Sequence, residues 1–475
     1  MRVNYHPKIW SVLVSTALIT GCVTPISPEL EMSIAEARWQ RSDVSAPASN
    51  EWLDEFADAS LASTVDQAID NNYALAQTRY QLEQSWATLA TTKAVRLPSV
   101  SLTIDGSTRR IGAGPQNNNF GGNAGGDAID SFGLGLDIRW QADIWGELSA
   151  ATRAAALTFA AQEAGFLDQR RRLVADVSRS WFNLAAANEQ VAVAKEQLTN
   201  ARQSLDIVEG GYRSGLNEAL DLYLARNATA QAENNLRNRE QLALEAATTL
   251  QLLAARNPGK ALMETPTLID ADAPIGFGVP SEMVTRRGDL QQAWLNLLSA
   301  NADLAVAHKQ RFPSLNLVAS ASDSADKFID VFDGQPLGWV LLGTLVQPVF
   351  EGGRLKAISE RARARVLELE QRYLELVNAA FGEVENAISR RAALNARYTA
   401  AEQALNDAET ALTLSLEQYQ RGLVNYATVL ESQQRAFDAR VGVVDLRNQK
   451  LQNRIDLHQA LGGSYGAEDQ LEASL

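Results

Sequence analysis

Cysteine is almost absent from this sequence, since Cys22 is the only one among 475 residues. A single cysteine excludes a disulfide within the chain and a zinc site built from several cysteines. The three histidines, His6, His308 and His458, stand far apart with no ligand pattern around them. The four methionines do not cluster either, so no soft-metal site is expected.

Catalytic signatures are also missing. The sequence contains no Gly-x-Ser-x-Gly, no His-Glu-x-x-His and no phosphate-binding loop followed by Lys-Ser or Lys-Thr. Its many carboxylates fall on helical faces, where they are ordinary charge patterning. The net charge of −14 opposes binding to nucleic acid, which needs a basic surface. We therefore predict neither an enzyme nor a nucleic-acid-binding protein.

Long apolar runs are absent after Cys22, because no stretch there reaches 18 residues. We expect no transmembrane helix, so a membrane crossing by this chain would need a β-barrel.

The N-terminus predicts export. Arg2 and Lys8 precede an apolar stretch at 9–19, and Ile19-Thr20-Gly21-Cys22 places small residues before the cysteine. Residues 1–21 are typical of a lipoprotein signal peptide, which would make an acylated Cys22 the first mature residue. An ordinary signal peptide with a chance cysteine is the alternative. With Val23 rather than aspartate after the cysteine, we expect an outer-membrane lipid anchor, followed by an extended segment over 22–60.

The sequence repeats itself. Tyr212–Leu222 recurs as Tyr419–Val429, 207 residues later, with Tyr-x-x-Gly-Leu in each copy. Leu97-Pro98-Ser99 is echoed by Phe312-Pro313-Ser314 in the same order. These pairs predict a tandem duplication in which each half contains helix, strand, strand, very long helix, tip and helix. We expect repeats at 61–260 and 281–465, a linker at 261–280 and a flexible acidic tail at 466–475.

Four segments have the alternation of strands. In the first half, apolar residues at 100–104 and 132–140 alternate with polar ones; the second half has a shorter pattern at 315–319 and an apolar stretch at 338–350. Loops are expected at 112–127 and 322–336. A soluble sheet with one buried face would alternate in the same way. Four strands cannot close a barrel with a lumen, so a barrel would require several chains.

Helices are expected over most of the remaining chain. Stretches without proline at 148–212 and 353–419 are each about 65 residues long, which corresponds to roughly 100 Å of helix. Shorter partners follow at 220–255 and 427–461. Alanine dominates the apolar seam, which favours a wall one helix thick. A lone coiled coil would not explain the strands.

Together these features resemble the TolC family of outer-membrane factors, in the lipoprotein branch of tripartite efflux systems. The resemblance depends on an ordered set of motifs: the lipobox at Cys22, Pro98-Ser99, Pro313-Ser314, Asp143-Ile144-Trp145-Gly146, Phe350-Glu351-Gly352-Gly353-Arg354, the two tips, and Val279-Pro280-Ser281 with Arg286-Arg287-Gly288-Asp289. Gly288 stands where the family usually has proline and is expected to loosen the start of a helix. Arg287-Gly288-Asp289 is also an integrin-type adhesion tripeptide, which is the alternative interpretation of this segment.

The resemblance implies a homotrimer that is mainly α-helical with membrane β-strands. Its 12-stranded outer-membrane barrel, with four strands from each protomer, would continue into a long periplasmic α-helical barrel. The implied function is a passive exit duct for small molecules, with an RND-type inner-membrane pump and a periplasmic adaptor as partners. Type I protein secretion is the alternative, followed by a scaffold lipoprotein without a pore. No cofactor is implied apart from the covalent lipid on Cys22.

The same resemblance implies two sets of site residues. The tips expected to contact the adaptor consist of Tyr212, Arg213, Gly215, Leu216, Tyr419, Arg421, Gly422 and Leu423. The residues expected to constrict the periplasmic aperture are Glu431, Gln434, Asp221 and Tyr223. Glycine is expected at the tips because a helix hairpin needs a residue that accepts positive φ. A ring of carboxylates at the aperture would favour cations.

Overall fold

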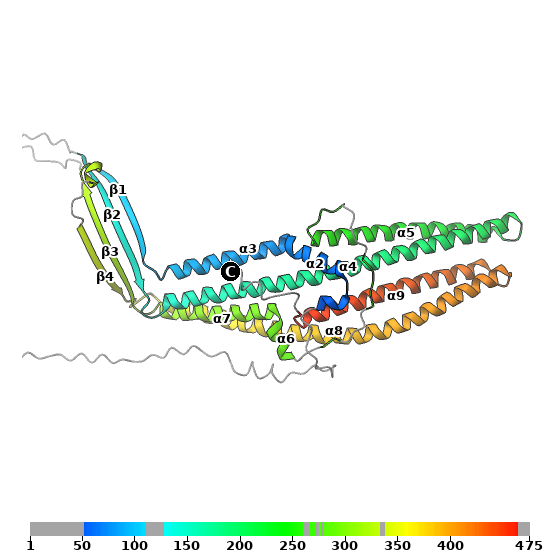
Figure 1. Cartoon of the computed structure of the whole chain (residues 1–475). Helices are drawn as coiled ribbons and strands as arrows, with labels where there is room; N and C mark the ends of the chain where they lie inside the picture. The colour runs from blue at the N-terminus through cyan, green and yellow to red at the C-terminus, as the bar shows by residue number, and fades with distance from the viewer. Residues whose placement is uncertain are drawn as a thin grey trace, which may run out of the picture.

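The structure is a computed structural model that describes residues 52–110, 128–259, 266–270, 275–276, 280–332 and 338–463. The described part is elongated, with a four-stranded sheet at one end and two helical hairpins at the other (Figure 1). The predicted signal peptide, Cys22, the loop at 112–127 and the tail at 466–475 lie outside the described residues, as does part of the predicted linker.

Each half of the chain runs helix, strand, strand, long helix, tip, helix, which confirms the predicted tandem repeat. The first half consists of η1 (Trp52–Phe56), α2 (Ala59–Asn71), α3 (Tyr73–Ala94), β1 (Ser99–Arg110), β2 (Ala128–Ala142), α4 (Glu147–Arg213) and α5 (Ala219–Leu253). The second consists of α6 (Pro280–Arg286), α7 (Gly288–Lys309), β3 (Ser314–Ala325), η2 (Phe328–Phe332), β4 (Gly338–Val346), α8 (Arg354–Gln420) and α9 (Tyr426–Ala460). Even the lengths match, since α4 and α8 both have 67 residues, and α5 and α9 both have 35.

The sheet has one apolar face. Its strands are antiparallel in the order β1-β2-β3-β4, and the register pairs Leu102 with Leu136, Leu136 with Ala321, and Ala321 with Trp339. Because side chains alternate along a strand, this register gathers the apolar residues on one side. The apolar face comprises Val100, Leu102, Ile104, Phe132, Leu134, Leu136, Ile138, Trp140, Leu315, Leu317, Ala319, Ala321, Trp339, Leu341 and Leu345. The opposite face of β1, β2 and β3 carries mainly small or polar residues, while β4 is apolar on both sides, as predicted.

Two strand boundaries differ from the sequence-based expectation. The loop predicted from Ser322 is wrong at its start, because β3 continues to Ala325, which pairs with Phe132 of β2. Alternating alanine and serine gave little contrast in the sequence, and the ladder with β2 extends the strand. The predicted strand at 338–350 ends early, at Val346. Pro348 follows closely and has no N–H to donate to a ladder.

Glycines turn the chain from the sheet into the long helices. Gly146 precedes α4 with φ 72°, and Gly353 precedes α8 with φ 88°. Such a left-handed backbone favours glycine because it has no Cβ. The Asp143 carboxylate accepts hydrogen bonds from the backbone N–H groups of Leu148 and Ser149, at 2.9 and 2.8 Å. It thereby satisfies donors at the helix start that would otherwise lack a partner.

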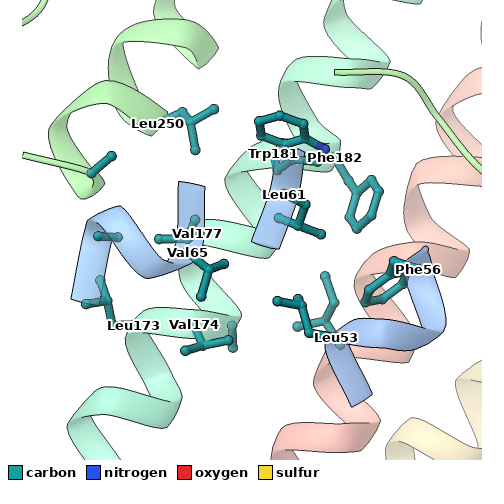
Figure 2. Packing of buried hydrophobic residues seen from close by; sticks show 14 of the residues in the cluster. Leu53, Phe56, Leu61, Val65, Leu173, Val174, Val177, Trp181, Phe182 and Leu250 are labelled. Atoms are coloured by element: carbon teal, nitrogen blue, oxygen red, sulfur yellow. The ribbon is translucent and has the colours of Figure 1, made fainter. Parts of the chain in front are cut away.

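The largest hydrophobic cluster lies midway along the helices, where η1 and α2 pack on α4 (Figure 2). The ring of Phe56 in η1 packs against that of Phe182 in α4, with centroids 5.0 Å apart and a tilt of 56°. Glu55 accepts hydrogen bonds from Arg454 and lies 3.1 Å from Nε2 of His458, both buried on α9. The expectation of an extended segment up to residue 60 is therefore wrong at its end: η1 and the start of α2 belong to this core.

Small residues contribute to the seam within the first hairpin. In the first hairpin, Ala194, Leu198 and Ala201 of α4 pack against Ala232 and Leu236 of α5. Alanine brings the two backbones close, which suits a wall one helix thick. Among the described helices, none is both long and apolar enough to cross a membrane.

Gly288 has a packing role that the sequence did not indicate. It is buried at the start of α7, and a Cβ added there would lie 2.8 Å from Cβ of Asp168 and 3.1 Å from the carbonyl oxygen of Ala164. Both neighbours belong to α4. Glycine here therefore permits the close approach of α7 to α4, a role beyond the expected loosening of the helix start.

Candidate functional site

The two hairpin tips close with the same turn. Gly215 and Gly422 both have φ 72°. In the first tip the N–H of Leu216 donates to the carbonyl of Gly211, and in the second the N–H of Leu423 donates to that of Gln418. This pattern is a Schellman turn, in which a left-handed glycine ends the helix. The prediction of glycine with positive φ at both tips is confirmed.

Most of the predicted adaptor-contacting side chains are exposed. Leu216 is 83% exposed and Leu423 is 69% exposed at equivalent positions after the two glycines. Arg213 and Arg421 are also exposed, and each pairs with a glutamate one helical turn earlier, at 3.0 and 3.8 Å. Both guanidinium side chains remain largely exposed in these pairs, so they are accessible to another protein.

The two tip tyrosines are placed differently. Tyr212 is 44% exposed, whereas Tyr419 is half-buried with its ring 5.5 Å from that of Tyr426. The hydroxyl of Tyr419 is buried and has no hydrogen-bond partner within the described part of the chain. The two positions are equivalent in sequence but differ in packing, and Tyr212 is the more accessible of the two.

An apolar cluster joins the two hairpins just behind the tips. Val208 of α4 and Leu222 and Ala225 of α5 pack with Tyr426 and Val429 of α9. All five side chains are buried, with exposed fractions of at most 6%. The two repeats therefore meet through hydrophobic contact at the end that carries the predicted aperture.

Among the four predicted aperture residues, Asp221 lies beside this cluster. Burial raises the pKa of Asp221, and the nearby Glu218 carboxylate raises it further. Burial also raises the pKa of Tyr426 to about 12, and the negative charge of Asp221 makes a smaller contribution to this increase. The structure thus brings Asp221 of the first repeat close to the tyrosines of the second.

The other three aperture residues are more exposed. Glu431 accepts a hydrogen bond from Arg435 at 2.6 Å, one turn along α9. Gln434 donates to Asp438 at 2.9 Å and lines a polar groove of about 270 Å³ between the hairpins. Tyr223 is 67% exposed. Among the described residues, no hydrogen bond or ion pair joins these side chains to one another or to Asp221, so a ring would have to form between protomers.

A row of arginines on α9 is a feature that the sequence reading missed. Arg440 pairs with Glu196 of α4 at 2.7 Å and with Glu409 of α8 at 2.6 Å, and Arg447 pairs with Glu189 of α4 at 3.1 Å. We call Arg440, Arg447 and Arg454 the arginine row. Their spacing of seven residues places them on one face of the helix. That period was visible in the sequence and was the available signal.

Across the described ranges, no group of three or more histidine, cysteine, aspartate and glutamate residues is placed to hold a metal ion. Met283 is 2% exposed within a hydrophobic cluster with Ile275 and Leu290.

A sheet with one exposed apolar face, continuous with long helical hairpins, defines a channel-forming protein of the outer membrane. The model of the family "Outer membrane efflux protein" matches residues 64–256 and 279–463, and the chain belongs to this family.

Known relatives agree along nearly the whole chain. The pyoverdine export outer membrane protein OpmQ of Pseudomonas aeruginosa is 30% identical over 466 residues, which cover 96% of this chain and 97% of OpmQ. The outer membrane channel CmeC of Campylobacter jejuni has the same fold, with a TM-score of 0.82 at 21% identity over 92% of this chain and 93% of CmeC. A crystal structure of CusC gives a TM-score of 0.76 at 25% identity, over 90% of this chain and 99% of that one.

These findings establish the class of protein. The chain is an outer-membrane efflux channel of a tripartite system and has the fold of trimeric TolC-like channels. The predicted fold and function are thus confirmed. The alternative of a scaffold without a pore is wrong, because the members of this family are channels.

Proposed function

We propose that this channel is the passive exit duct of a pump whose inner-membrane component is of the RND type, and that it conducts small molecules. OpmQ, the relative with 30% identity, is named for the export of pyoverdine. Type I protein secretion has no observation in its favour. We also propose that a lipid on Cys22 anchors the chain in the outer membrane, which mass spectrometry of the mature N-terminus would test.

The tips contact the adaptor in this proposal. The observation that supports it is the equivalence of the two Schellman turns, each followed by a highly exposed leucine, Leu216 or Leu423. Three protomers would present six such tips around the axis. Exposed apolar side chains at the end of a periplasmic hairpin suit contact with another protein.

The aperture in this proposal lies just behind the tips. Asp221 and Glu431 carry the carboxylates, and Tyr223 and Gln434 add polar groups. Support comes from their clustering at the free end of the hairpins, where Asp221 adjoins the contact between repeats. Carboxylates that line a constriction attract cations and repel anions.

The test is single-channel conductance of the purified trimer in a planar bilayer. Glu431→Ala is expected to raise the conductance of the closed channel and to lower its cation selectivity, because each protomer loses one carboxylate and the hydrogen bond to Arg435. The matched control is Glu360→Ala, which removes another exposed i,i+4 partner, that of Lys356, near the start of α8. Unchanged conductance in Glu431→Ala would remove Glu431 from the aperture.

A further inference from the structure

The short helix η2 lies on the apolar face of the sheet. It follows the end of β3 and contacts both β3 and β2. The ring of Phe328 in η2 lies 5.8 Å from the ring of Phe132, in an edge-to-face arrangement at 76°. Phe132 shares its face with Leu134 and Leu136 because side chains alternate along β2. In a membrane barrel the apolar face is directed toward lipid, so η2 lies outside the barrel and not over its lumen.

The side chains of η2 divide into an inner and an outer set. Val331 is 5% exposed and packs inward, whereas Phe328 is 51% exposed and Ile329 is 69% exposed. Asp326 and Lys327, which precede the helix, are exposed as well. The outer surface of η2 therefore combines two large apolar side chains with a polar edge.

The strands alone provide a short apolar band. On β2 the band runs from Trp140 to Phe132, which are eight residue steps apart. Eight steps span about 26 Å along a strand, and about 20 Å along the barrel axis when the strands are tilted by ~40°. Beyond Phe132 the same face carries Asp130, which accepts a hydrogen bond from Thr108 at 2.7 Å. An outer-membrane barrel has an apolar band of about 25 Å, so the strands become polar too early on this side.

The position of η2 matches this shortfall. It connects β3 and β4 at the end of the sheet that points away from the helices, which is the extracellular end (Figure 1). We propose that Phe328 and Ile329 insert among lipid acyl chains just beneath the headgroups of the outer leaflet. Asp326 and Lys327 then remain in the headgroup layer, as charged side chains do at a membrane boundary. In this position η2 extends the apolar band and sets the depth of the barrel.

Fluorescence quenching by spin-labelled lipid tests this placement. Ile329→Cys in the full-length chain with Cys22→Ser carries a single thiol, which can be labelled with an environment-sensitive fluorophore. In phosphatidylcholine vesicles the label is expected to be quenched more by a nitroxide near the headgroup than by one at the acyl-chain end. Leu341→Cys, at the middle of the apolar face, should show the reverse order. Ser320→Cys, on the opposite face of β3, should show little quenching by either lipid.

The proposal would be overturned if the Ile329 label were quenched no more strongly than the Ser320 label. It would also be overturned if η2 contacted another protein instead of lipid. A second measurement does not depend on labelling. Ile329→Asp is expected to lower the yield of heat-resistant trimer in membranes by roughly two- to five-fold, because a charge would then lie at the hydrocarbon boundary. Ser324→Asp, which adds the same charge on the opposite face of β3, is the matched control and should leave the yield unchanged. Equal yields for wild type and Ile329→Asp would also overturn the placement.

Discussion

Burial determines the charge of Asp221 at the tips. Its carboxyl has a raised pKa because it is partly withdrawn from water, and Glu218 adds like charge nearby. A carboxyl with a raised pKa takes up its proton at a higher pH than an ordinary aspartate does. As the pH falls, Asp221 therefore loses its charge before an ordinary aspartate does.

Asp221→Asn is expected to stabilise the trimer at neutral pH and to change little below about pH 4. The sign follows because a carboxyl with a raised folded-state pKa favours folding at low pH, and this contribution is lost as the pH rises through the folded pKa. Thermal unfolding at about pH 7 and about pH 3.5 measures the difference. Glu218→Gln should act in the same direction but more weakly, since it removes only the second cause. Equal stability of Asp221→Asn and wild type at neutral pH would contradict this account.

The tip glycines are required for their backbone conformation and not for space. A Cβ at Gly422 would meet no atom within 4 Å, yet the φ of 72° disfavours any residue with a side chain. Gly422→Ala is therefore expected to destabilise the hairpin by about 1 kcal/mol. Gly210 also lies in open space but inside α4, where alanine is a better helix former than glycine. Gly210→Ala is therefore expected to stabilise the hairpin by up to about 1 kcal/mol. Shifts of the same sign in thermal unfolding of both variants would show that φ is not the cause.

At the scale of elements, the contact between the two repeats changes character along the helices. Near the tips it is hydrophobic, through Tyr426 and Val429, and between the tips and the central hydrophobic cluster α4 and α9 also meet through polar pairs. Gln433 donates to Ser204 at 2.9 Å, and Arg440 and Arg447 pair with glutamates of α4. Polar pairs of partly exposed groups can exchange with water at low cost, so this seam is suited to small movements of one hairpin against the other.

Arg440→Ala tests this seam. It removes pairs to two other helices at once, and we expect a loss of about 1 kcal/mol in stability together with a higher conductance of the closed channel. Arg365→Ala is the matched control, because Arg365 pairs only with Glu368 on its own helix. Bilayer recordings and thermal unfolding of both variants measure the two effects. If Arg365→Ala raised the conductance as much as Arg440→Ala does, the polar contacts between the repeats would not be the cause of the increase.

At the scale of the whole molecule, the sheet of one chain is unfinished. Leu341 is 70% exposed and Trp339 is 77% exposed in the isolated chain, and β1 and β4 are the two outer strands of the sheet. Three chains close these strands into a 12-stranded barrel and place the apolar face in lipid. The large apolar side chains that are exposed in the isolated protomer are thus the ones that contact lipid in the assembled barrel.

Leu341→Lys is expected to cost about 2 to 4 kcal/mol of barrel stability, since it would place a charge near the middle of the membrane. Ser320→Lys lies on the opposite face of the neighbouring strand and should be tolerated in the lumen. The yield of heat-resistant trimer in outer membranes distinguishes the two. Equal losses for both variants would mean that the apolar face does not contact lipid.

Much of the fold could be predicted because its signals are local. The predicted helix from Leu148 to Tyr212 differs from α4 by one residue at each end, since glycines stop the helix on both sides. The strand patterns around Leu102 and Leu136 were correct because alternation is a property of neighbouring residues. The helical turn η1 and the extension of β3 to Ala325 were missed, because both depend on contacts with distant segments.

The sequence by itself determined the duplication, the order of elements and the glycine turns at the tips, since each follows from periodicity or from backbone sterics within a few residues. Only the tertiary structure decided that Tyr419 turns inward while Tyr212 stays exposed, that Gly288 is needed for the approach of α7 to α4, and that η2 returns over Phe132. These outcomes depend on which side chains meet across segments far apart in the chain. Local pattern cannot distinguish them, because equivalent positions of the two repeats have different neighbours once the helices pack.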